Sequence, residues 1–366
     1  MQKQSYELIS IYKRKFGCKV IAYKSEYPTP LFFIALIPWI AITLILNPNI
    51  KTIHANEGLV ALFLTPFLLW PRIRLSTTIH GLDAVFQVAP YQWWFRNLLR
   101  KFWHIIAVSK ETRSLCMDAG IPADRVTFIA NACDFNDPQE LDKQFPDWIS
   151  SKLNKDLGNY HLLVSIGRPV VRKGFSWFAR HVLPQLRDNV LYLIVGPETQ
   201  TSKTLTFLKR MLPKRMFWLF CQFAGIPTDF FELQELARKD DRLILLGKLE
   251  QKWLDQLLMH CDLFVMPNLK IPGDFEGFGL VAQEAVVKGA LCLAAEVDGI
   301  PSAIQNDQNG LLIEVGNAEV WVKNIQELLD NPDRRIEMKS RFSQHLRESG
   351  YSWEQMVDRH HQLFTS

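Results

Sequence analysis

The residues whose types and spacing most clearly suggest chemistry lie in the segment 274–290, DFEGFGLVAQEAVVKGA. Gly277 and Gly279 have no side chain, so the backbone from Gly277 through Phe278 and Gly279 to Leu280 can approach a ligand closely. A helix that we expect to begin near Leu280 presents unpaired N–H groups and the positive end of its dipole. This combination predicts a binding site for an anion.

Two glutamates flank the predicted anion site. Glu284 lies just over one turn into the helix, where its carboxylate can accept hydrogen bonds from a neutral polyol such as a ribose. Glu276 stands in the loop, where it can bind a second set of hydroxyls. A nucleotide-sugar, with phosphate flanked by sugar hydroxyls, fits this arrangement. The alternative is a Gly-rich turn before an ordinary helix, with Glu284 a solvated surface residue.

The segment resembles the E-x7-E signature of glycosyltransferase family 4, the group 1 glycosyl transferases, which are retaining enzymes with a GT-B fold. The resemblance implies that Glu276 meets the donor sugar and that Glu284 meets the nucleotide ribose. It further implies an α/β GT-B fold, with two Rossmann-like domains whose parallel sheets face each other across a cleft. The donor substrate would be a nucleotide-sugar, and no cofactor is expected.

A basic turn follows the first predicted strand of the C-terminal half. The sequence GRPVVRKG begins at Gly167 and is similar to the family pattern G-R-x3-x-K-G. Arg172 and Lys173 would place positive charge on the diphosphate leaving group. We find no D-x-D motif for a divalent metal, so cations and a helix N-terminus are expected to stabilise the developing charge. The alternative is a solvated basic loop.

Two histidines end predicted strands in the N-terminal half. His80 stands in STTIHGLD, and family members carry a comparable histidine near the donor sugar. The expected role is a hydrogen bond to the sugar or the reacting centre, because ligands of α/β folds collect at the carboxyl ends of strands. His54 in TIHANEG is a weaker, acceptor-side candidate. A structural role is the alternative for both histidines.

The chain departs from the family in two turns. Asn131 occupies the place of the N-G-V-D turn, but Ala132 and Cys133 replace Gly and Val. If this turn requires a positive φ, alanine would be strained there. Asp298 stands in place of the first Gly of the G-G-x-P-E turn.

Alternating strand-like and helix-like patterns predict parallel α/β sheets in both halves. In the N-terminal half, strands are expected at residues 19–23, 52–54, 75–80, 105–108 and 126–129. In the C-terminal half, they are expected at residues 161–167, 190–196, 242–247, 262–267, 290–295 and 311–315. Helices are expected around residues 6–16, 175–186, 253–260 and 353–364.

These elements predict an acceptor-side domain at residues 1–145 and a nucleotide-sugar domain at 146–338. The helices of 339–366 follow, and the last one is expected to return to the N-terminal domain. In the family, a first strand and a Gly-rich loop precede the helix of residues 6–16. The N-terminal domain is therefore expected to lack its first strand. Either an upstream coding stretch is missing, or this lineage dispenses with the loop.

Composition is that of a folded protein, with 366 residues, of which 48% are hydrophobic and 22% charged. Six cysteines show no C-x-x-C pair and no regular spacing, which favours reduced thiols in the cytoplasm. The first residues have no apolar stretch of the kind that a secretory signal requires, so none is expected.

The charge distribution and the apolar segments together indicate that the protein contacts a membrane surface. Residues 1–133 hold fifteen Lys/Arg and seven Asp/Glu, a balance of +8, so with a net charge of +4 the remainder carries −4. Residues 31–46 are uncharged but shorter than the ~20 residues of a bilayer span. Residues 91–103 and 205–223 mix aromatic and basic side chains. We expect peripheral contact with the inner face of the cell membrane, although core-facing helices with basic outer faces are the alternative.

The predicted function is therefore retaining transfer of a sugar from a nucleotide-sugar to a lipid-linked or surface-polysaccharide acceptor, in polysaccharide biosynthesis. One alternative is a non-catalytic, glycosyltransferase-like partner subunit. The other is a different GT-B enzyme, such as a sugar epimerase. Basic-aromatic segments also suit nucleic acid, but no nucleic-acid module accompanies them, and no nucleic-acid partner is expected.

Overall fold

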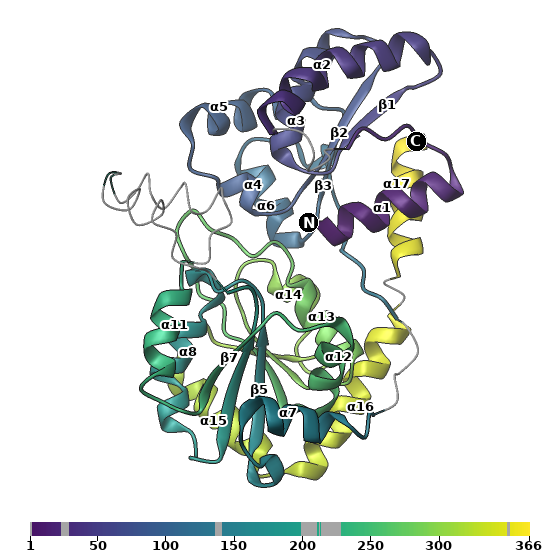
Figure 1. The fold of residues 1–366 in the computed structure, drawn as a ribbon. Helices are drawn as coiled ribbons and strands as arrows, with labels where there is room; N and C mark the ends of the chain where they lie inside the picture. Colours follow the sequence, from purple (N-terminus) through teal and green to yellow (C-terminus); the bar gives the residue numbers. More distant parts are fainter. Residues whose placement is uncertain are drawn as a thin grey trace. The chain divides into compact units, whose positions relative to one another are not determined.

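The computed structural model describes residues 2–22, 29–135, 141–198, 211, 213, 228–349 and 352–366. They form two compact α/β units, each built on a parallel sheet (Figure 1). Unit 1 consists of Met1–Asp134, Gly273–Phe278 and Gly350–Ser366. Unit 2 consists of Phe135–Pro272 and Gly279–Ser349.

The sheet of unit 1 has four parallel strands in the order β1-β2-β3-β4. They are β1 (Thr52–Ala55), β2 (Arg74–Ile79), β3 (His104–Ala107) and β4 (Val126–Phe128). All four were predicted. The strand expected at residues 19–23 is wrong, because residues 19–22 have no regular structure and residue 23 lies outside the described residues. That apolar run is short and Val20 is exposed, so little burial stabilises an extended strand there.

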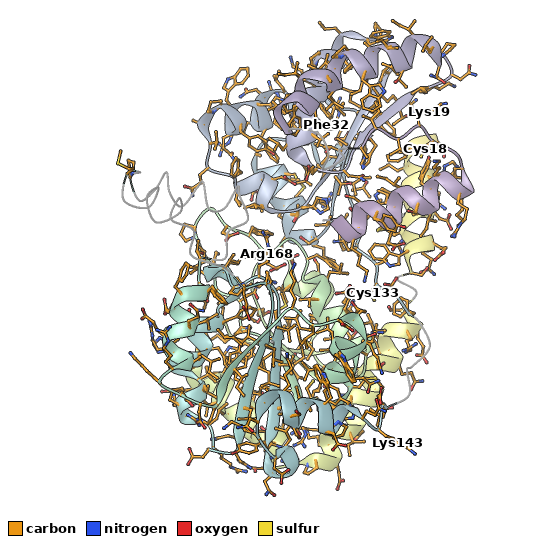
Figure 2. All side chains as sticks on the ribbon, viewed as in Figure 1. Cys18, Lys19, Phe32, Cys133, Lys143 and Arg168 are labelled. Carbon is orange, nitrogen blue, oxygen red and sulfur yellow. The ribbon has the colours of Figure 1, made fainter. Side chains whose placement is uncertain are left out.

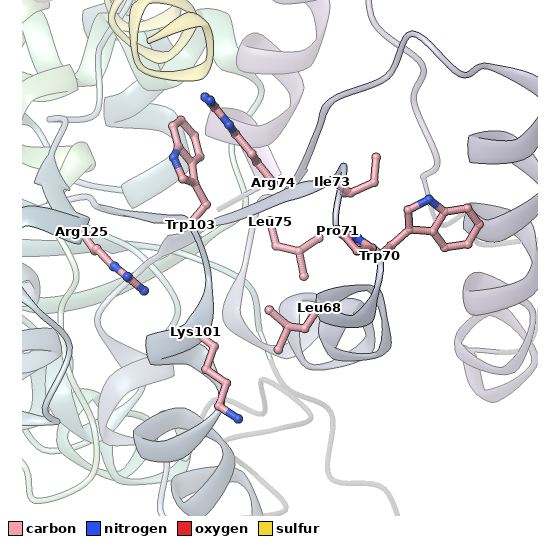
Figure 3. A pocket seen from close by; sticks show the side chains of 9 residues that line it. All are labelled: Leu68, Trp70, Pro71, Ile73, Arg74, Leu75, Lys101, Trp103 and Arg125. Carbon is pink, nitrogen blue, oxygen red and sulfur yellow. The ribbon is translucent and has the colours of Figure 1, made fainter.

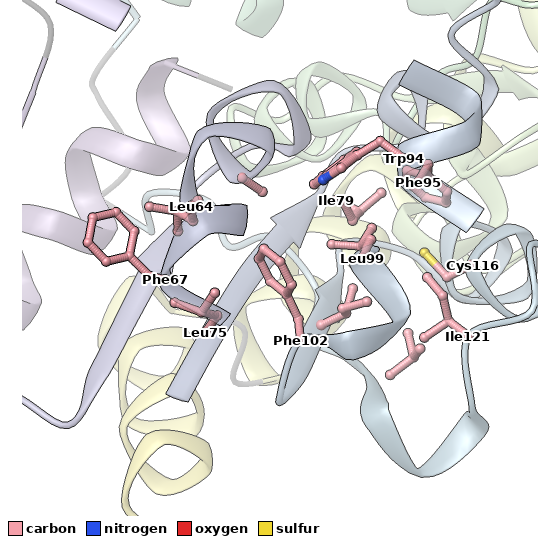
Figure 4. Packing of buried hydrophobic residues seen from close by; sticks show 14 of the residues in the cluster. Leu64, Phe67, Leu75, Ile79, Trp94, Phe95, Leu99, Phe102, Cys116 and Ile121 are labelled. Carbon is pink, nitrogen blue, oxygen red and sulfur yellow. The ribbon is translucent and has the colours of Figure 1, made fainter. Parts of the chain in front are cut away.

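One face of this sheet is apolar and carries the core of unit 1 (Figure 4). Successive side chains of a strand point to opposite faces, so Leu75 and Ile79 of β2 and Ile105 of β3 share this side. The helices that contribute buried residues to this core are α2 (Thr29–Leu46), α3 (Gly58–Leu64), α5 (Ala89–Asn97) and α6 (Lys110–Asp118).

The opposite face of the same sheet is polar. Ser76 and Thr78 of β2 are fully buried there and hydrogen-bond the two ring nitrogens of His54, at 2.8 and 3.0 Å. His104 of β3 pairs with Thr127 of β4 in the same way, at 2.8 Å. Hydroxyl and imidazole groups therefore satisfy one another across the strands, as buried polar groups must.

The last helix, α17 (Trp353–Thr365), lies on this polar side. The ring of Phe364 is centred 5.1 Å from that of His54, and the ring of His360 is 6.1 Å away. The first helix, α1 (Gln2–Lys15), packs against α17, where the ring of Phe16 stacks on His361 at 3.6 Å. The two ends of the described chain therefore meet within unit 1.

Unit 2 has a six-stranded parallel sheet in the order β10-β9-β8-β5-β6-β7. Its strands are β5 (His161–Ile166), β6 (Val190–Val195), β7 (Leu243–Gly247), β8 (Leu263–Met266), β9 (Cys292–Ala295) and β10 (Leu311–Ile313). All six were predicted, with ends that agree to within two residues. Every residue of β6 and β8 is buried, as expected for strands covered on both faces.

Helices accompany these strands, and their side chains fill the interior of the unit (Figure 2). They include α7 (Phe145–Leu153), α8 (Phe175–His181), α11 (Phe230–Ala237), α12 (Gln251–His260), α13 (Leu280–Val287), α15 (Ala318–Leu329) and α16 (Pro332–Glu348). The helix predicted at 175–186 ends early, because Pro184 enforces a short 3-10 turn, Leu183–Gln185.

Of the two aromatic and basic segments expected at a membrane surface, only the first lies in the described residues. The stretch 91–103 is the end of α5 followed by a 3-10 turn, Leu99–Lys101, rather than one helix. The stretch 205–223 lies outside the described residues apart from 211 and 213. In the part of the chain that the structure describes, no helix is both long and apolar enough to cross a bilayer.

Candidate functional site

The carboxyl edge of the unit 2 sheet is held together by backbone contacts. A side chain on Gly174 would collide with the carbonyl oxygen of Pro267, which follows β8. A side chain on Gly196, after β6, would collide with the carbonyl oxygen of Gly167, after β5. Because only glycine fits at these two positions, the ends of three neighbouring strands are fixed closely against one another.

The basic turn lies at this edge. Arg172 and Lys173 belong to a 3-10 turn, Val171–Lys173, between β5 and α8, and the backbone N–H of Leu269 donates to the carbonyl of Arg172 at 2.8 Å. Lys173 is buried, and its aliphatic stem runs beside Gly167. A buried lysine is uncommon, so this charge is a notable feature of the edge. Arg168, labelled in Figure 2, directly follows Gly167.

The amino end of α8, which follows this turn, is already bound to a carboxylate. The backbone N–H and the hydroxyl of Ser176 donate to Asp229, at 3.1 and 2.6 Å. Asp229 is buried, and burial raises the pKa of its carboxyl group. Sequence reasoning missed Asp229, since it lies far along the chain and no local motif marks it.

The amino end of α13 differs. It begins after Gly279, which has a left-handed φ of 88°. Its N-cap position is Gly279, which has no side chain to cap this end, and its first turn holds no acidic residue. The position of a Cβ on Gly279 lies 3.5 Å from the methyl group of Met266, at the end of β8. The end of β8 therefore contacts both the basic turn and the start of α13, with Glu284 half-buried one turn further along.

Unit 2 thus brings together five predicted donor-binding residues around the end of β8: Arg172, Lys173, Gly279, Leu280 and Glu284. The remaining residues of the signature, Glu276, Gly277 and Phe278, belong to unit 1. The predicted signature is therefore divided between the two compact units at the Phe278–Gly279 bond. Nothing in the sequence pattern indicated this division.

Within unit 1, the loop that carries Glu276 packs on the end of β2. A side chain on Gly277 would collide with the carbonyl oxygen of His80. Gly81 has a φ of 86°, and a side chain there would collide with the ring of Phe275. Two glycines therefore allow the loop to lie directly against the His80–Gly81 backbone, so Glu276 and His80 are held near each other.

His80 is buried, with 7% of its surface exposed. Its Nε2 donates to the carbonyl oxygen of Asn56 at 2.8 Å, and its backbone N–H donates to Asp83 at 2.8 Å. A carbonyl can only accept, so Nε2 carries the proton and Nδ1 is an acceptor. Burial lowers the pKa of His80 to about 4, so its imidazole is neutral at pH 7. Such a ring can accept a hydrogen bond from a hydroxyl.

His54, the weaker candidate of the sequence analysis, and Ser109, at the end of β3, both have structural partners. His54 engages both ring nitrogens with Ser76 and Thr78, and burial lowers its pKa well below the ordinary value. Ser109, which follows β3, caps α6 by accepting from the backbone N–H of Thr112 at 2.9 Å. These contacts account for both side chains without a ligand.

The two turns that depart from the family differ in strain. Ala132 does not have a positive φ, so its methyl group carries no backbone penalty. Asn131 is buried, and its Oδ1 has no hydrogen-bond partner among the described residues. Asp298 does adopt a left-handed φ, of 52°, where the family pattern has glycine.

Comparison with known proteins gives two family matches. Residues 147–348 match the family described as Glycosyl transferases group 1, and residues 12–137 match the family described as Glycosyltransferase Family 4. The first match spans more than half of the chain.

Among curated proteins, the chain is similar to D-inositol 3-phosphate glycosyltransferases. The protein of Corynebacterium aurimucosum is 37% identical over 162 residues, which are 43% of this chain and 37% of that protein. The protein of Corynebacterium efficiens is 32% identical over 162 residues, again 43% of this chain and 37% of the relative. The matched segment therefore spans little more than a third of these relatives.

Solved structures share the fold over a longer range. HepE of Anabaena, in complex with UDP and glucose, has a TM-score of 0.70 at 17% identity, covering 92% of this chain and 81% of that one. Sucrose-phosphate synthase of Thermosynechococcus elongatus has a TM-score of 0.67 at 18% identity, covering 93% and 79%. At these identities the likeness concerns the fold, which is the predicted GT-B fold.

Proposed function

Because this chain belongs to the group 1 glycosyl transferases, we propose that it transfers a sugar from a nucleotide-sugar donor with retention of the anomeric configuration. The main observation in support of a donor site is that the basic turn and the amino end of α13 both contact the end of β8 in unit 2. The basic turn supplies Arg172 and Lys173, and the amino end of α13 supplies backbone N–H groups and the positive end of its helix dipole. Both features attract an anion.

In this proposal the diphosphate of the donor lies against Lys173, Arg172 and the start of α13. As the bond between the sugar and the diphosphate breaks, negative charge grows on the departing nucleotide. Fixed cations and oriented N–H groups lower the energy of that charge without rearranging. Glu284, one turn into α13, accepts hydrogen bonds from the ribose hydroxyls.

In the proposal, residues of unit 1 bind the sugar of the donor. Glu276 and His80 are the proposed residues that touch the donor sugar, because the loop of Glu276 packs on the His80 backbone. The neutral imidazole of His80 would accept a hydrogen bond from a sugar hydroxyl at Nδ1. Its low pKa makes it a poor base for deprotonating an acceptor hydroxyl, which fits a retaining rather than an inverting reaction.

The acceptor is proposed to be a lipid-linked or surface-polysaccharide precursor, used in polysaccharide biosynthesis at the inner face of the cell membrane. The excess of positive charge in residues 1–133 supports an anionic surface or acceptor as partner of this half. No metal or organic cofactor is part of the proposal. Turnover should therefore continue in the presence of a chelator such as EDTA.

A thermal-shift panel with UDP, GDP, ADP and their sugars tests the donor site. UDP-sugars come first, since the similar HepE structures contain UDP and UDP-glucose. A ligand at a hundred times its Kd should stabilise the protein by about 2.7 kcal/mol. The shift should vanish in Glu284→Ala and persist in Glu337→Ala, which alters an exposed glutamate on α16. If no nucleotide shifts the wild-type midpoint, the donor proposal is wrong.

The second candidate function, a non-catalytic partner subunit, would keep donor binding without turnover. It is supported by the two turns that depart from the family pattern, at Ala132 and Cys133 and at Asp298. Release of UDP from a bound UDP-sugar, slowly by water or faster with an acceptor, distinguishes the two. A nucleotide-induced shift without any release of UDP would favour the partner subunit.

A further inference from the structure

Helix α2 exposes an unusual apolar surface on unit 1. One side of the helix, with Leu36, Ile40 and Leu44, is buried in the core of the unit. The other side is exposed and is formed by the residues that we call the α2 stripe: Ile34, Trp39, Ile42, Ile45 and Leu46. The whole helix contains no charged residue.

This surface is not that of an ordinary solvated helix. An amphipathic helix places charged and polar residues on its outer side, whereas α2 is apolar all round. Contiguous apolar patches on soluble proteins mark interaction sites. Since the inner side of α2 packs into the protein, only its outer side is available to an apolar partner. A helix held in this way lies along a surface rather than across a membrane.

A basic and aromatic pocket lies beyond the end of α2. It has a volume of about 290 Å³ and opens at the amino ends of the unit 1 strands (Figure 3). Three cations, Arg74, Lys101 and Arg125, line it together with two indoles, Trp70 and Trp103. The guanidinium of Arg74 lies 5.0 Å from the ring centre of Trp103. We call this site the amino-edge pocket.

The stripe and the pocket are adjacent. Arg72 donates to the carbonyl of Leu44, in the last turns of α2, at 2.9 Å. Its guanidinium also lies 5.7 Å from the ring centre of Trp70, which lines the pocket. Leu69, next to Trp70, is 89% exposed and adds an apolar side chain to the same loop. One loop therefore connects the end of the apolar stripe to the cationic pocket.

Charge along this edge has one dominant sign. The segments 47–51, 69–74, 99–103 and 122–125, which lead into the four strands, together hold six Lys/Arg and one Asp/Glu. Trp and Tyr beside Lys and Arg are typical of protein surfaces at the lipid headgroup level. An apolar stripe beside a cationic, indole-lined pocket is complementary to acyl chains beside phosphate headgroups.

We propose that the α2 stripe and the amino-edge pocket dock unit 1 on an anionic phospholipid bilayer. The stripe enters the boundary between headgroups and acyl chains, and the pocket takes a headgroup phosphate. This inference deepens the proposed function by naming the membrane partner of unit 1. It rests on the proposed function only in assuming that the acceptor is linked to a lipid. It assigns to the amino edge a role distinct from that of the carboxyl edge, where His80 and Glu276 lie.

Co-sedimentation of the full chain with vesicles tests the proposal. Phosphatidylcholine vesicles with and without phosphatidylglycerol are the probes, at low and high salt. We expect binding to the anionic vesicles that weakens as salt screens the charges. The Ile42→Ser, Ile45→Ser double variant should bind about tenfold more weakly, because it removes two inserted apolar side chains. Lys101→Glu should also bind about tenfold more weakly, because each basic residue near an anionic leaflet contributes separately.

Matched controls lie on unit 2. Ile336→Ser removes an isoleucine that is 67% exposed on α16, against 56% for Ile42. Lys323→Glu makes the same charge change as Lys101→Glu at an exposed position of α15. Both controls should bind vesicles like the wild type. Circular dichroism and the melting midpoint of each variant show that it is folded.

Wild-type binding to neither vesicle, or equally to both, would overturn the proposal. So would undiminished binding of either the stripe variant or Lys101→Glu. A melting shift with glycerol phosphate but no vesicle binding would assign the pocket to a soluble anion and also overturn it. Vesicle binding requires no donor and the nucleotide panel requires no vesicle, so failure of one proposal is distinguishable from failure of the other.

Discussion

The carboxyl edges of the two sheets are built in different ways. In unit 2, backbone packs on backbone, with Gly174 against Pro267 and Gly196 against Gly167. In unit 1, Gly277 also packs on the His80 carbonyl, but hydrogen bonds of histidine side chains order the edge and the polar face next to it as well. His80 binds the Asn56 carbonyl, and His54 binds two hydroxyls. The glycine positions of unit 2 leave no room for a side chain, whereas the hydrogen bonds of unit 1 depend on the protonation state of the histidines.

This contrast explains what each edge can do. A backbone-packed edge holds the proposed phosphate site in one geometry at any pH in the physiological range. A histidine-based edge keeps uncharged acceptors beside the proposed sugar site, provided that the imidazoles stay neutral. A glycine substitution should therefore destabilise unit 2 at any pH, whereas acid should affect unit 1 most.

The largest expected effect comes from Gly174→Ala. The new methyl group would collide with the Pro267 carbonyl and would occupy a left-handed backbone with a φ of 68°. Overpacking and left-handed strain together should lower the free energy of unfolding by about 4 kcal/mol. Urea denaturation measures this. Gly289→Ala, with a φ of 89° but open space, is the control and should lose only the strain part. Equal losses in both variants would contradict the backbone-packed edge.

Acid should destabilise unit 1 next most strongly. Burial lowers the pKa of His80 and of His360 from 6.5 to about 4, so the unfolded chain takes up these protons first as the pH falls. Between pH 6.5 and 5, each histidine should cost about 2 kcal/mol of stability. His54 acts in the same direction. No stability is lost through these histidines above pH 6.5, where they are neutral in both the folded and the unfolded chain.

Asp83 opposes this trend, because burial raises its pKa from 3.8 to about 6 and the folded state then binds the proton first. It should return about 1.4 kcal/mol by pH 5, leaving a net loss of about 2.5 kcal/mol from His80, His360 and Asp83 together. Urea denaturation at pH 7 and pH 5 checks the sum. His360→Gln should make the dependence shallower, and an unfolding energy that does not change with pH would refute the neutral-histidine edge.

Lys173→Met should weaken nucleotide binding by about 2 kcal/mol, because it removes one charged hydrogen-bond donor to phosphate. Calorimetric titration with the nucleotide identified in the thermal-shift panel measures the change. Lys270→Met removes an exposed charge from the neighbouring loop and serves as the control. If the two variants bind alike, Lys173 does not contact the phosphate.

The smallest effect is expected for Ser109→Ala. The hydroxyl caps α6 and also donates to the Thr112 hydroxyl at 2.8 Å. Loss of the cap should cost about 1 kcal/mol in the unfolding energy. If Ser109 instead bound a substrate, stability would change little and the KM would rise. Denaturation and steady-state kinetics on the same preparation separate these outcomes.

Sequence reasoning predicted the unit 2 sheet well, because each of its strands is a buried apolar run between turn residues. The prediction at residues 19–23 was wrong because a short apolar run indicates a strand only if a neighbouring strand pairs with it. Asp229 was missed since its partner, Ser176, is fifty-three residues earlier in the chain. Both outcomes follow from contacts that no local pattern contains.

The sequence by itself determined the order of the strands along the chain, the glycines that allow close backbone approach and the signature of Glu276 and Glu284. These depend on local periodicity and side-chain size. Only the tertiary structure decided that His80 is neutral, that Asp229 occupies the start of α8 and that the signature is divided after Phe278. The protonation of a group and the capping of a helix depend on burial and on partners that folding brings from distant parts of the chain.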